Sequence, residues 1–361
     1  MQDTYRAVLI GCSRMGAFID HEIGDREYIL RPYSHAASYR ACERTELVAC
    51  SDLRPDVMAE VGRHYGIPPE KQYLDYRRMI DVERPDIVSI ATQPEGRAEI
   101  AVHAAEHGAR AIYCEKAMAA SLAEAQSMVD ACERHGVAFN LGTQRRWHPG
   151  FRTMRDVIGG GRLGALLSVI IQETAVFDGA SHYFDNLLFL NGDRRASWVQ
   201  MQLRAGDWTL EGDRLTGDPA AHGGIGFENG VVAYAVPSAQ DVAFEARCAD
   251  GTVRCTQQHG YSMRRREHPG QPRSPFADVP FPDWQPVSPT QRLVQDLVRS
   301  LDTGEPPAGG VRVAYAATEL TFAAIESHLR GGARVDLPLA GSTVRLERDR
   351  APRQPRFQPP Q

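Results

Sequence analysis

The chain has 361 residues, of which 42% are hydrophobic and 24% are charged, and its formal net charge is -5. This length predicts two domains, and the composition is that of a folded globular protein. The acidic balance, without a clustered basic stretch, argues against nucleic acid as a partner. The sequence has no run of 18 apolar residues, so we expect no membrane span.

The seven cysteines are odd in number and scattered, without a C-x-x-C pair or a histidine spacing that suits zinc. They predict a reduced, cytoplasmic protein without a metal site. Only Cys248 and Cys255, which flank a predicted hairpin turn at Asp250-Gly251, leave a disulfide open. Residues 1–16 lack the pattern of a secretory leader, which also favours the cytoplasm.

The first 145 residues alternate short apolar runs with amphipathic stretches, the pattern of a doubly wound parallel sheet. Predicted strands cover residues 6–10, 46–51, 86–91, 109–113 and 137–141, and predicted helices cover 55–65, 94–107 and 121–135. Continuous apolar strands suit a sheet that is covered on both faces. Residues 1–145 are therefore predicted to form an α/β dinucleotide-binding Rossmann domain.

Residues 146–342 are predicted to form an α+β domain with a large open, mainly antiparallel sheet. After a helix at 149–158, segments with period-two alternation lie within 166–257, and helices follow at 289–301 and 312–329. A sheet with helices on one face leaves the other face to a partner, which predicts a homodimer or homotetramer. The polar, proline-rich residues 343–361 are predicted to be a flexible tail.

The first predicted strand ends in a G-x-S-x-x-G turn. Its residues are Gly11, Cys12, Ser13, Arg14, Met15 and Gly16. Gly11 supplies the tight turn and Gly16 lets helix and strand approach, so that backbone N–H groups can hold a pyrophosphate. Ser13 replaces the glycine that usually allows closest approach, and its hydroxyl can donate to a phosphate.

Asp52 closes the second predicted strand, where an acidic residue grips the adenosine ribose of NAD. Its charge repels the 2'-phosphate of NADP, although Arg54 leaves NADP open. An insertion at residues 21–34 lengthens the spacing from the glycine turn. The alternative is that Asp52 is only a turn residue.

Five segments occur in the order seen in the Gfo/Idh/MocA oxidoreductases, and the chain therefore resembles that family over nearly its whole length. They are Gly11–Gly16, Ala91–Pro94, Cys114–Ala117, Arg146–Pro149 and Asp178–Asp185. The resemblance implies a Rossmann domain, an open-sheet domain and NAD(P)-dependent oxidation of a sugar or cyclitol hydroxyl. Ala117 stands where the family has proline, and Ala180 where it has glycine.

The resemblance also implies roles for individual residues. The implied catalytic residues are Lys116, His182 and Asp178. The implied substrate contact is Asp185. Arg146, in a motif that can reach the cofactor or the cleft, and Trp147, which can stack on a sugar face, are two further candidates for substrate binding. The implied cofactor contacts, besides the glycines and Asp52, are Ser13, Arg14, Met15, Thr92, Gln93, Pro94, Glu115 and Lys116.

The chemistry of hydride transfer favours the same assignments. A hydroxyl proton must be removed, and histidine has an unperturbed pKa near working pH. Lys116 is one of only two lysines in the chain, so background composition did not supply it. The structural alternatives are a surface lysine, a histidine at a helix start, a salt bridge for Arg146 and packing for Trp147.

Two other functions stay open. One is an enzyme that retains NAD and uses transient oxidation for glycoside cleavage, elimination or epimerisation. The other is a regulatory protein that senses a sugar or NAD without turnover, since a fold does not fix a function.

Overall fold

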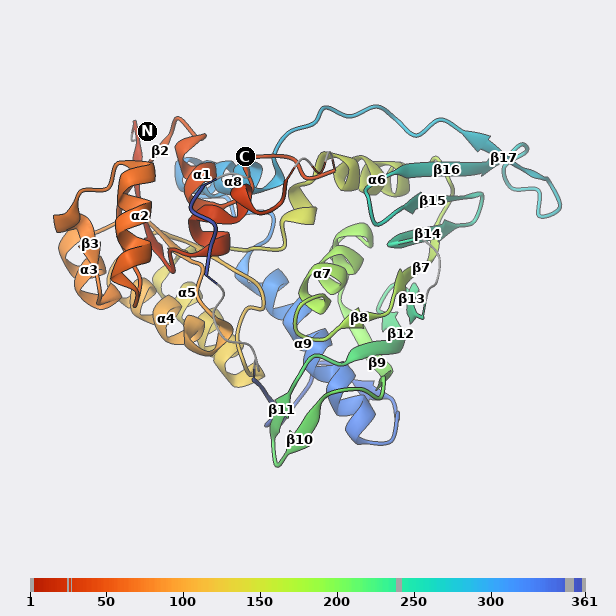
Figure 1. Ribbon diagram of the computed structural model, residues 1–361. Helices are drawn as coiled ribbons and strands as arrows, with labels where there is room; N and C mark the ends of the chain where they lie inside the picture. The colour runs from red at the N-terminus through yellow and green to blue at the C-terminus, as the bar shows by residue number, and fades with distance from the viewer. Residues whose placement is uncertain (1–2, 25, 27, 238–241, 348–353, 359–361) are drawn as a thin grey trace. The chain divides into compact units, whose positions relative to one another are not determined.

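The computed structural model describes residues 3–24, 26, 28–237, 242–347 and 354–358 (Figure 1). The chain divides into two compact units. The first comprises Met1–Trp147, Val287–Tyr315 and Asp349–Gln361, and the second comprises His148–Pro286 and Ala316–Arg348. The predicted boundaries had placed residues 287–315 in the second domain.

The first unit contains a six-stranded sheet of order β3-β2-β1-β4-β5-β6 in which every pair is parallel. The strands are β1 (Tyr5–Ile10), β2 (Thr45–Ser51), β3 (Gln72–Tyr73), β4 (Ile87–Ile90), β5 (Ala111–Cys114) and β6 (Ala138–Leu141). The predicted doubly wound sheet is confirmed. The strand order reverses between β1 and β4, which is where such sheets bind ligands at the carboxyl ends of their strands.

Short helices and longer amphipathic ones cover this sheet. They are η1 (Arg14–Phe18), η2 (Ile19–His21), α1 (His35–Arg40), α2 (Pro55–Tyr65), η3 (Pro69–Lys71), α3 (Tyr76–Glu83), η4 (Pro94–Gly96), α4 (Arg97–Glu106), α5 (Leu122–His135), η5 (Gln144–Trp147) and α8 (Pro289–Thr303). In α5 the Ser121 side chain accepts from the Glu124 N–H, and Gly136 ends the helix in the left-handed conformation.

Helix α8 belongs to the first unit because of what its apolar side contacts. Leu293 and Leu297 are fully buried in one cluster with Tyr5, Ile87 and Ala111 of the parallel sheet. Burial of leucines against this sheet stabilises α8 there. A helical sequence pattern shows which side is apolar but not which sheet receives it, and this explains the difference from the predicted boundary.

The second unit is built on a ten-stranded sheet whose main path is β17-β16-β15-β14-β7-β13-β12-β9-β18, with β8 paired to β12. Its strands are β7 (Leu166–Gln172), β8 (Thr174–Ala175), β9 (Ala196–Leu203), β12 (Ala220–Phe227), β13 (Val232–Val236), β14 (Phe244–Cys248), β15 (Gly251–Cys255), β16 (Tyr261–Arg266), β17 (Phe276–Val279) and β18 (Val335–Asp336). Among the described strands of this sheet, only β7 and β13 pair in parallel. The predicted open, mainly antiparallel sheet is confirmed.

The remaining elements of the second unit are helices and a small sheet. The helices are α6 (Pro149–Gly159), α7 (Ala180–Leu190) and α9 (Val311–Leu329), the last of which spans the division between the units. A three-stranded sheet joins β10 (Thr209–Glu211), β11 (Arg214–Thr216) and β19 (Arg345–Glu347).

The predicted flexible tail differs in its described parts. Residues 345–347 form β19, which pairs with β11, and residues 354–358 contact the first unit. Residues 348–353 and 359–361 lie outside the described residues.

All seven cysteines are free and buried. In the hairpin of β14 and β15, Cys248 is in register with Gly251 and Cys255 with Phe244. The disulfide left open by the sequence therefore does not form. Every thiol packs as a small apolar group.

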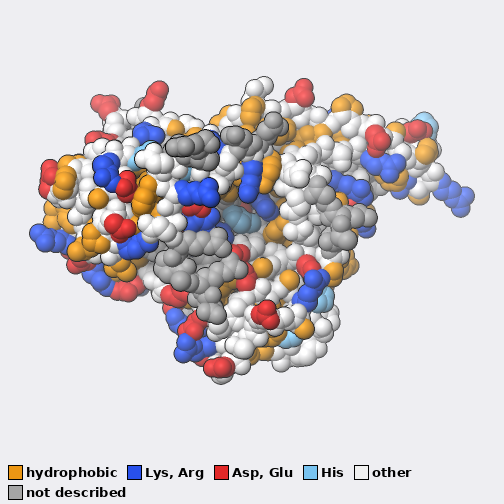
Figure 2. All heavy atoms as spheres, viewed as in Figure 1, with side chains coloured by type: hydrophobic (Ala, Val, Ile, Leu, Met, Phe, Trp, Pro, Cys, Tyr) orange, Lys and Arg blue, Asp and Glu red, His pale blue; other side chains and the backbone are white. Residues whose placement is uncertain are grey.

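Within the described part of the chain, no helix is long and apolar enough to cross a membrane. On the face seen in Figure 2, acidic and basic side chains lie next to one another.

Candidate active site

The glycine turn after β1 depends on close backbone contacts. Gly11 has a φ of 88°, and a Cβ there would lie 2.7 Å from the carbonyl carbon of Ala91. A Cβ on Gly16 would lie 2.0 Å from the Gly11 carbonyl oxygen. Larger residues at either position would force the turn apart. The positive φ of Gly11 agrees with the tight turn predicted there, and the contact at Gly16 agrees with the predicted close approach.

Asp52 is hydrogen-bonded to this turn. Its Oδ2 accepts from the Cys12 N–H at 2.7 Å, and its Oδ1 accepts from the Arg54 N–H at 2.9 Å. Two backbone donors therefore fix the carboxylate at the carboxyl end of β2, beside the glycine turn. This position suits a grip on an adenosine ribose. The bond from the Arg54 N–H is also one that an aspartate in a turn makes, so the alternative of a turn residue stays open.

The turn leads into η1 and η2 and not into a regular α-helix. Ser13 accepts the Ala17 N–H with its backbone carbonyl, and Arg14 pairs with Glu22 at 2.6 Å. The predicted insertion at 21–34 closes onto η2, because the Asp20 carboxylate accepts from the N–H groups of residues 33 and 34, each at 2.8 Å. Residues 25 and 27 lie outside the described residues.

Lys116 follows β5, at the same edge of the sheet as the glycine turn. Its backbone N–H donates to Glu115 Oε2 at 3.2 Å. Glu115 Oε1 lies 3.1 Å from Nε2 of His35, and His35 Nδ1 lies 2.7 Å from the Ser89 hydroxyl. Because a carboxylate only accepts, Nε2 carries the imidazole proton and Ser89 donates to Nδ1. His35 thus helps to hold the Lys116 loop in place through its hydrogen bond to Glu115.

Burial affects the protonation states of His35 and Glu115. Burial lowers the pKa of His35 below its ordinary 6.5, against the opposing effect of Glu115. Burial alone would raise the pKa of Glu115, but the hydrogen bond from His35 and the nearby positive charges of Arg97 and Lys116 act against it, and the pKa falls. A neutral imidazole and an ionised carboxylate follow at neutral pH.

Arg97 joins the two loops that flank the predicted nicotinamide end. It is 4% exposed, and its Nε donates to the Thr92 carbonyl at 3.1 Å. Its Nη1 donates to the carbonyl of Ala117, next to Lys116. A planar guanidinium can reach both loops at once, which a lysine cannot. Sequence reasoning missed Arg97, whose one signal was a charge on the buried side of α4.

Thr92, Gln93 and Pro94 follow β4, so they share the carboxyl edge with Gly11, Asp52 and Lys116. Parallel strands bring their carboxyl ends to one edge, and the predicted cofactor residues therefore gather there. This gathering is what a dinucleotide needs. Their contacts with a cofactor stay predictions.

In the second unit, Asp178 lies just before α7, and His182 and Asp185 lie on this helix. Asp185 is 2% exposed and follows His182 by about one helical turn, which places both on one side of the helix. Asp218, which sequence reasoning missed, fixes the approach to α7. Its carboxylate accepts from the N–H of Phe177 at 2.7 Å and from that of Asp178 at 3.2 Å.

The backbone beneath His182 packs closely at Gly179 and not at Ala180. A Cβ on Gly179 would lie 2.1 Å from the Thr174 hydroxyl oxygen, whereas Ala180 is fully buried with its methyl group accommodated. The His182 N–H donates to the Gly179 carbonyl at 2.9 Å. Alanine in place of the family's glycine is therefore compatible with α7.

A polar network that the sequence did not reveal lies beside His182. Gln172 Nε2 donates to the Tyr183 hydroxyl at 2.7 Å, and Gln257 Nε2 lies 3.3 Å from the same hydroxyl. Gln257 also donates to the Gln172 side-chain oxygen. Amides and a phenol from β7, α7 and the segment after β15 thus meet at one point. Such groups can exchange hydrogen bonds with sugar hydroxyls.

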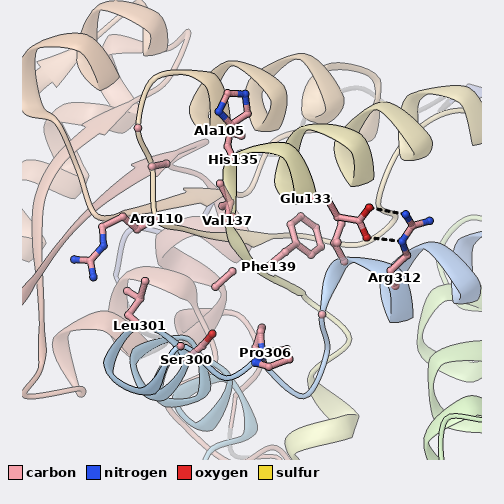
Figure 3. A pocket seen from close by; sticks show the side chains of 18 of the residues that line it. Ala105, Arg110, Glu133, His135, Val137, Phe139, Ser300, Leu301, Pro306 and Arg312 are labelled. Atoms are coloured by element: carbon pink, nitrogen blue, oxygen red, sulfur yellow. Dashed lines mark hydrogen bonds and ion pairs between the residues drawn. The ribbon is translucent and has the colours of Figure 1, made fainter.

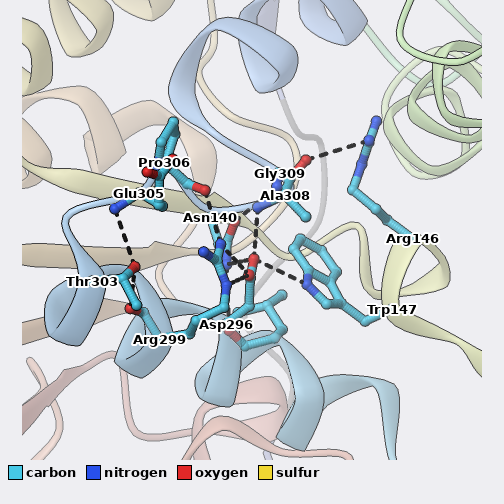
Figure 4. A network of polar contacts seen from close by, with 11 residues as sticks. Asn140, Arg146, Trp147, Asp296, Arg299, Thr303, Glu305, Pro306, Ala308 and Gly309 are labelled. Carbon is cyan, nitrogen blue, oxygen red and sulfur yellow. Dashed lines mark hydrogen bonds and ion pairs between the residues drawn. The ribbon is translucent and has the colours of Figure 1, made fainter.

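Arg146 and Trp147 lie in the interior of the first unit. Arg146 is fully buried, with Nη1 3.4 Å from the Ala308 carbonyl. Trp147 is 2% exposed and its Nε1 donates to Asp296 at 3.3 Å (Figure 4). Trp147 therefore packs in the core, as the alternative interpretation proposed. Neither side chain is shown to meet a substrate.

A hollow of about 760 Å³ lies elsewhere on the first unit (Figure 3). Arg110 and Val137, which line it, precede β5 and β6, so it opens at the amino ends of these strands. The predicted cofactor residues lie at the carboxyl ends. The hollow is thus separate from the candidate active site.

Among the described residues, one group of three could approach a metal: Asp81, His103 and His107, with ligand atoms within 4.8 Å of one another. The two imidazoles stack face to face, with centroids 3.7 Å apart and planes at 23°. Stacked rings do not aim their lone pairs at one point, so this geometry does not by itself indicate a metal ion.

Comparison with known proteins agrees with this geometry in the first unit. Residues 24–143 match a family model described as an oxidoreductase family with an NAD-binding Rossmann fold, GFO_IDH_MocA. This match covers about a third of the chain, and it agrees with the predicted family and with the predicted cofactor, NAD, over these residues. The choice between NAD and NADP stays a prediction.

Individual relatives match about a third of the chain. D-apiose dehydrogenase of Paraburkholderia graminis is 33% identical over 131 residues, 36% of this chain and 34% of that protein. Myo-inositol 2-dehydrogenase of Thermotoga maritima is 25% identical over 130 residues, 36% of this chain and 38% of that protein. The chain thus matches about a third of the length of these curated relatives.

The fold of the whole chain also has a counterpart. A structure of levoglucosan dehydrogenase, in complex with NADH and levoglucosan, has a TM-score of 0.74 at 20% identity, covering 93% of this chain and all of that one. At this identity the likeness establishes the fold and not the activity.

Proposed function

We propose that the chain is an NAD-dependent oxidoreductase that moves hydride between nicotinamide and a hydroxyl or ketone carbon of a sugar, sugar derivative or cyclitol. The observation that carries this proposal is the Lys116 loop. Arg97 and Glu115 hold it at the carboxyl edge of an NAD-binding sheet, beside the glycine turn. A hydride-transfer site needs a proton-handling group at this edge.

The residues divide the work of binding and proton transfer. Gly11–Gly16 and Asp52 would hold the pyrophosphate and ribose, and bound NAD supplies the hydride acceptor. His182 is the proposed base for the hydroxyl proton, and Lys116 hydrogen-bonds the reacting oxygen. Asp178 and Asp185 orient His182 or the substrate.

The substrate class follows from chemistry and from the relatives. D-apiose, myo-inositol and levoglucosan, named for three related dehydrogenases, are all polyhydroxylated rings or sugars. The Gln172, Tyr183 and Gln257 cluster offers several donors and acceptors to such a substrate.

Assembly and location form part of the same proposal. Tyr234 lies on β13 in the middle of the large sheet and is 45% exposed, which supports a homodimer or homotetramer formed through this face. Seven free, buried cysteines are consistent with the cytoplasm.

The first test is mass spectrometry of purified, denatured protein for co-purified nucleotide, together with NAD⁺ and NADP⁺ reduction over a panel of sugars and cyclitols. We expect exchangeable NAD and NADH formation with one class of substrate. Stoichiometric bound NAD without net reduction would instead indicate an internal redox cycle. Failure to bind either nucleotide would contradict the proposal.

Lys116→Ala and His182→Ala test the assigned chemistry. Each should lower turnover by at least about 100-fold while NAD binding is retained, because general acid-base groups contribute roughly this much. Lys71→Met, which changes the chain's other lysine, is the control. A wild-type rate in either alanine variant would refute the role of that residue.

A further inference from the structure

The C-terminal residues 354–358 are docked on the NAD-binding unit, and Phe357 is their anchor. Its ring meets Phe18 of η1 edge to face, with centroids 5.1 Å apart and planes at 77°, and packs against the buried cluster of η1 and α2. Pro355 is buried, and the Arg356 carbonyl lies 3.1 Å from Nδ1 of His21. Contacts from successive residues hold this segment in place.

This anchoring places Gln354 at the adenosine end of the cofactor site. Its Oε1 accepts from Arg54 Nη1 at 2.9 Å. Arg54 immediately precedes α2, and its backbone N–H donates to the ribose-side carboxylate of Asp52. Nη2 of Arg54 is buried and has no hydrogen-bond partner among the described residues.

The chemistry of Arg54 bears on the choice between the two nicotinamide cofactors. They differ by a phosphate on the adenosine 2'-oxygen, and a guanidinium is the side chain that best matches a phosphate. An arginine two residues after Asp52 would suit NADP⁺. Here Gln354 already takes up Nη1, and Nη2 is out of contact with solvent. A 2'-phosphate would have to displace Gln354, whereas the 2'-hydroxyl of NAD⁺ needs only Asp52.

We propose that the C-terminal segment is a specificity element that favours NAD⁺ over NADP⁺ by occupying Arg54, with Gln354 as the discriminating residue. This inference rests on the assignment of the first unit as the NAD-binding domain. It locates cofactor preference in a residue 300 positions from Arg54 in the sequence.

The test is calorimetric titration of the full chain with NAD⁺ and with NADP⁺, without substrate. In Gln354→Ala the Kd for NADP⁺ should fall about tenfold, the worth of one charge-assisted hydrogen bond, while the Kd for NAD⁺ stays within about twofold. Gln358→Ala removes an exposed amide from the same segment and should change neither. Phe357→Ala, which releases the anchor, should act like Gln354→Ala.

A double-mutant comparison makes the mechanism specific. In an Arg54→Ala background, Gln354→Ala should no longer alter the NADP⁺ affinity, because the group it releases is gone. Unchanged NADP⁺ affinity in Gln354→Ala, or an equal change for both cofactors, would overturn the proposal while leaving the NAD assignment intact. A wild-type chain that binds neither cofactor would overturn that assignment as well.

Discussion

The imidazole of His35 hydrogen-bonds the Glu115 carboxylate at 3.1 Å, and both side chains lie in the interior of the NAD-binding unit. The ring also stacks on Tyr113, with centroids 3.7 Å apart and planes 6° from parallel. Glu115 in turn accepts the N–H of Lys116. A core histidine is thus connected through one carboxylate to the proposed catalytic lysine.

This pair predicts a pH dependence of stability. Burial lowers the pKa of His35 in the folded chain. When the pH falls below the ordinary histidine pKa of 6.5, the unfolded chain therefore binds a proton at His35 that the folded chain does not bind. The contribution of His35 is complete above pH 6.5 and is lost as the pH falls. Between pH 6.5 and 5.5 the wild type should lose more unfolding free energy than His35→Gln. Urea denaturation at both pH values measures this difference, and equal losses would contradict it.

Arg97→Lys should impair turnover more than cofactor affinity. Lysine keeps the charge but cannot bond the Thr92 and Ala117 carbonyls together. We expect kcat to fall about 10-fold to 100-fold with the substrate found in the panel, since misplacement of a catalytic group has effects of this size. The NAD⁺ Kd should change little. Arg78→Lys, at an exposed position, is the control, and parallel losses in kcat and NAD⁺ binding would point to general misfolding.

Gly16→Ala should abolish measurable NAD⁺ binding or unfold the turn. The added methyl carbon would lie 2.0 Å from the Gly11 carbonyl oxygen. Relief of this clash requires a shift of the backbone, which costs folding free energy. Gly159→Ala, where a Cβ meets nothing within 4 Å, is the matched control and should bind normally. Titration and circular dichroism together separate lost binding from lost folding. Normal affinity in Gly16→Ala would refute the assigned role of the turn.

Tyr234→Glu tests the proposed assembly. A charge in the middle of the outer sheet face should disfavour burial against a second copy, because a buried unpaired carboxylate is costly. Light scattering coupled to size exclusion should show a smaller species than the wild type at equal concentration. Leu53→Glu, at a residue 88% exposed on the first unit, is the control. A wild-type chain that is already a monomer would exclude assembly through this face.

The features that were predicted correctly from the sequence are those marked by a short-range pattern of residues. Apolar runs defined the strands of the parallel sheet, and the glycine turn and Asp52 could be placed because each directly follows a strand. Parallel pairing then brings strand ends to one edge whatever lies between them. The cofactor edge was therefore predictable from a few residues.

The supporting contacts were not predictable in this way. Arg97 bonds a residue 20 positions away, and Asp218 bonds one 41 positions away. No short-range pattern marks such pairs, since an isolated arginine or aspartate resembles a surface residue. The contact of Gln354 was the hardest to predict, because the polar composition of the C-terminal segment indicates disorder. The segment is ordered because one aromatic residue, Phe357, packs against a buried cluster.

The interleaving of the two units limits how this protein can be recombined. Residues 1–147 alone would lack α8, and the buried side of the sheet at Tyr5, Ile87 and Ala111 would meet water. A chimaera that couples the first unit to a different second unit must therefore carry residues 287–315 and 349–361 along with it, and one of its junctions falls inside α9, between Tyr315 and Ala316. A single crossover in the sequence therefore cannot exchange one whole unit for another. Substitutions within the existing second unit are a simpler route to a new specificity.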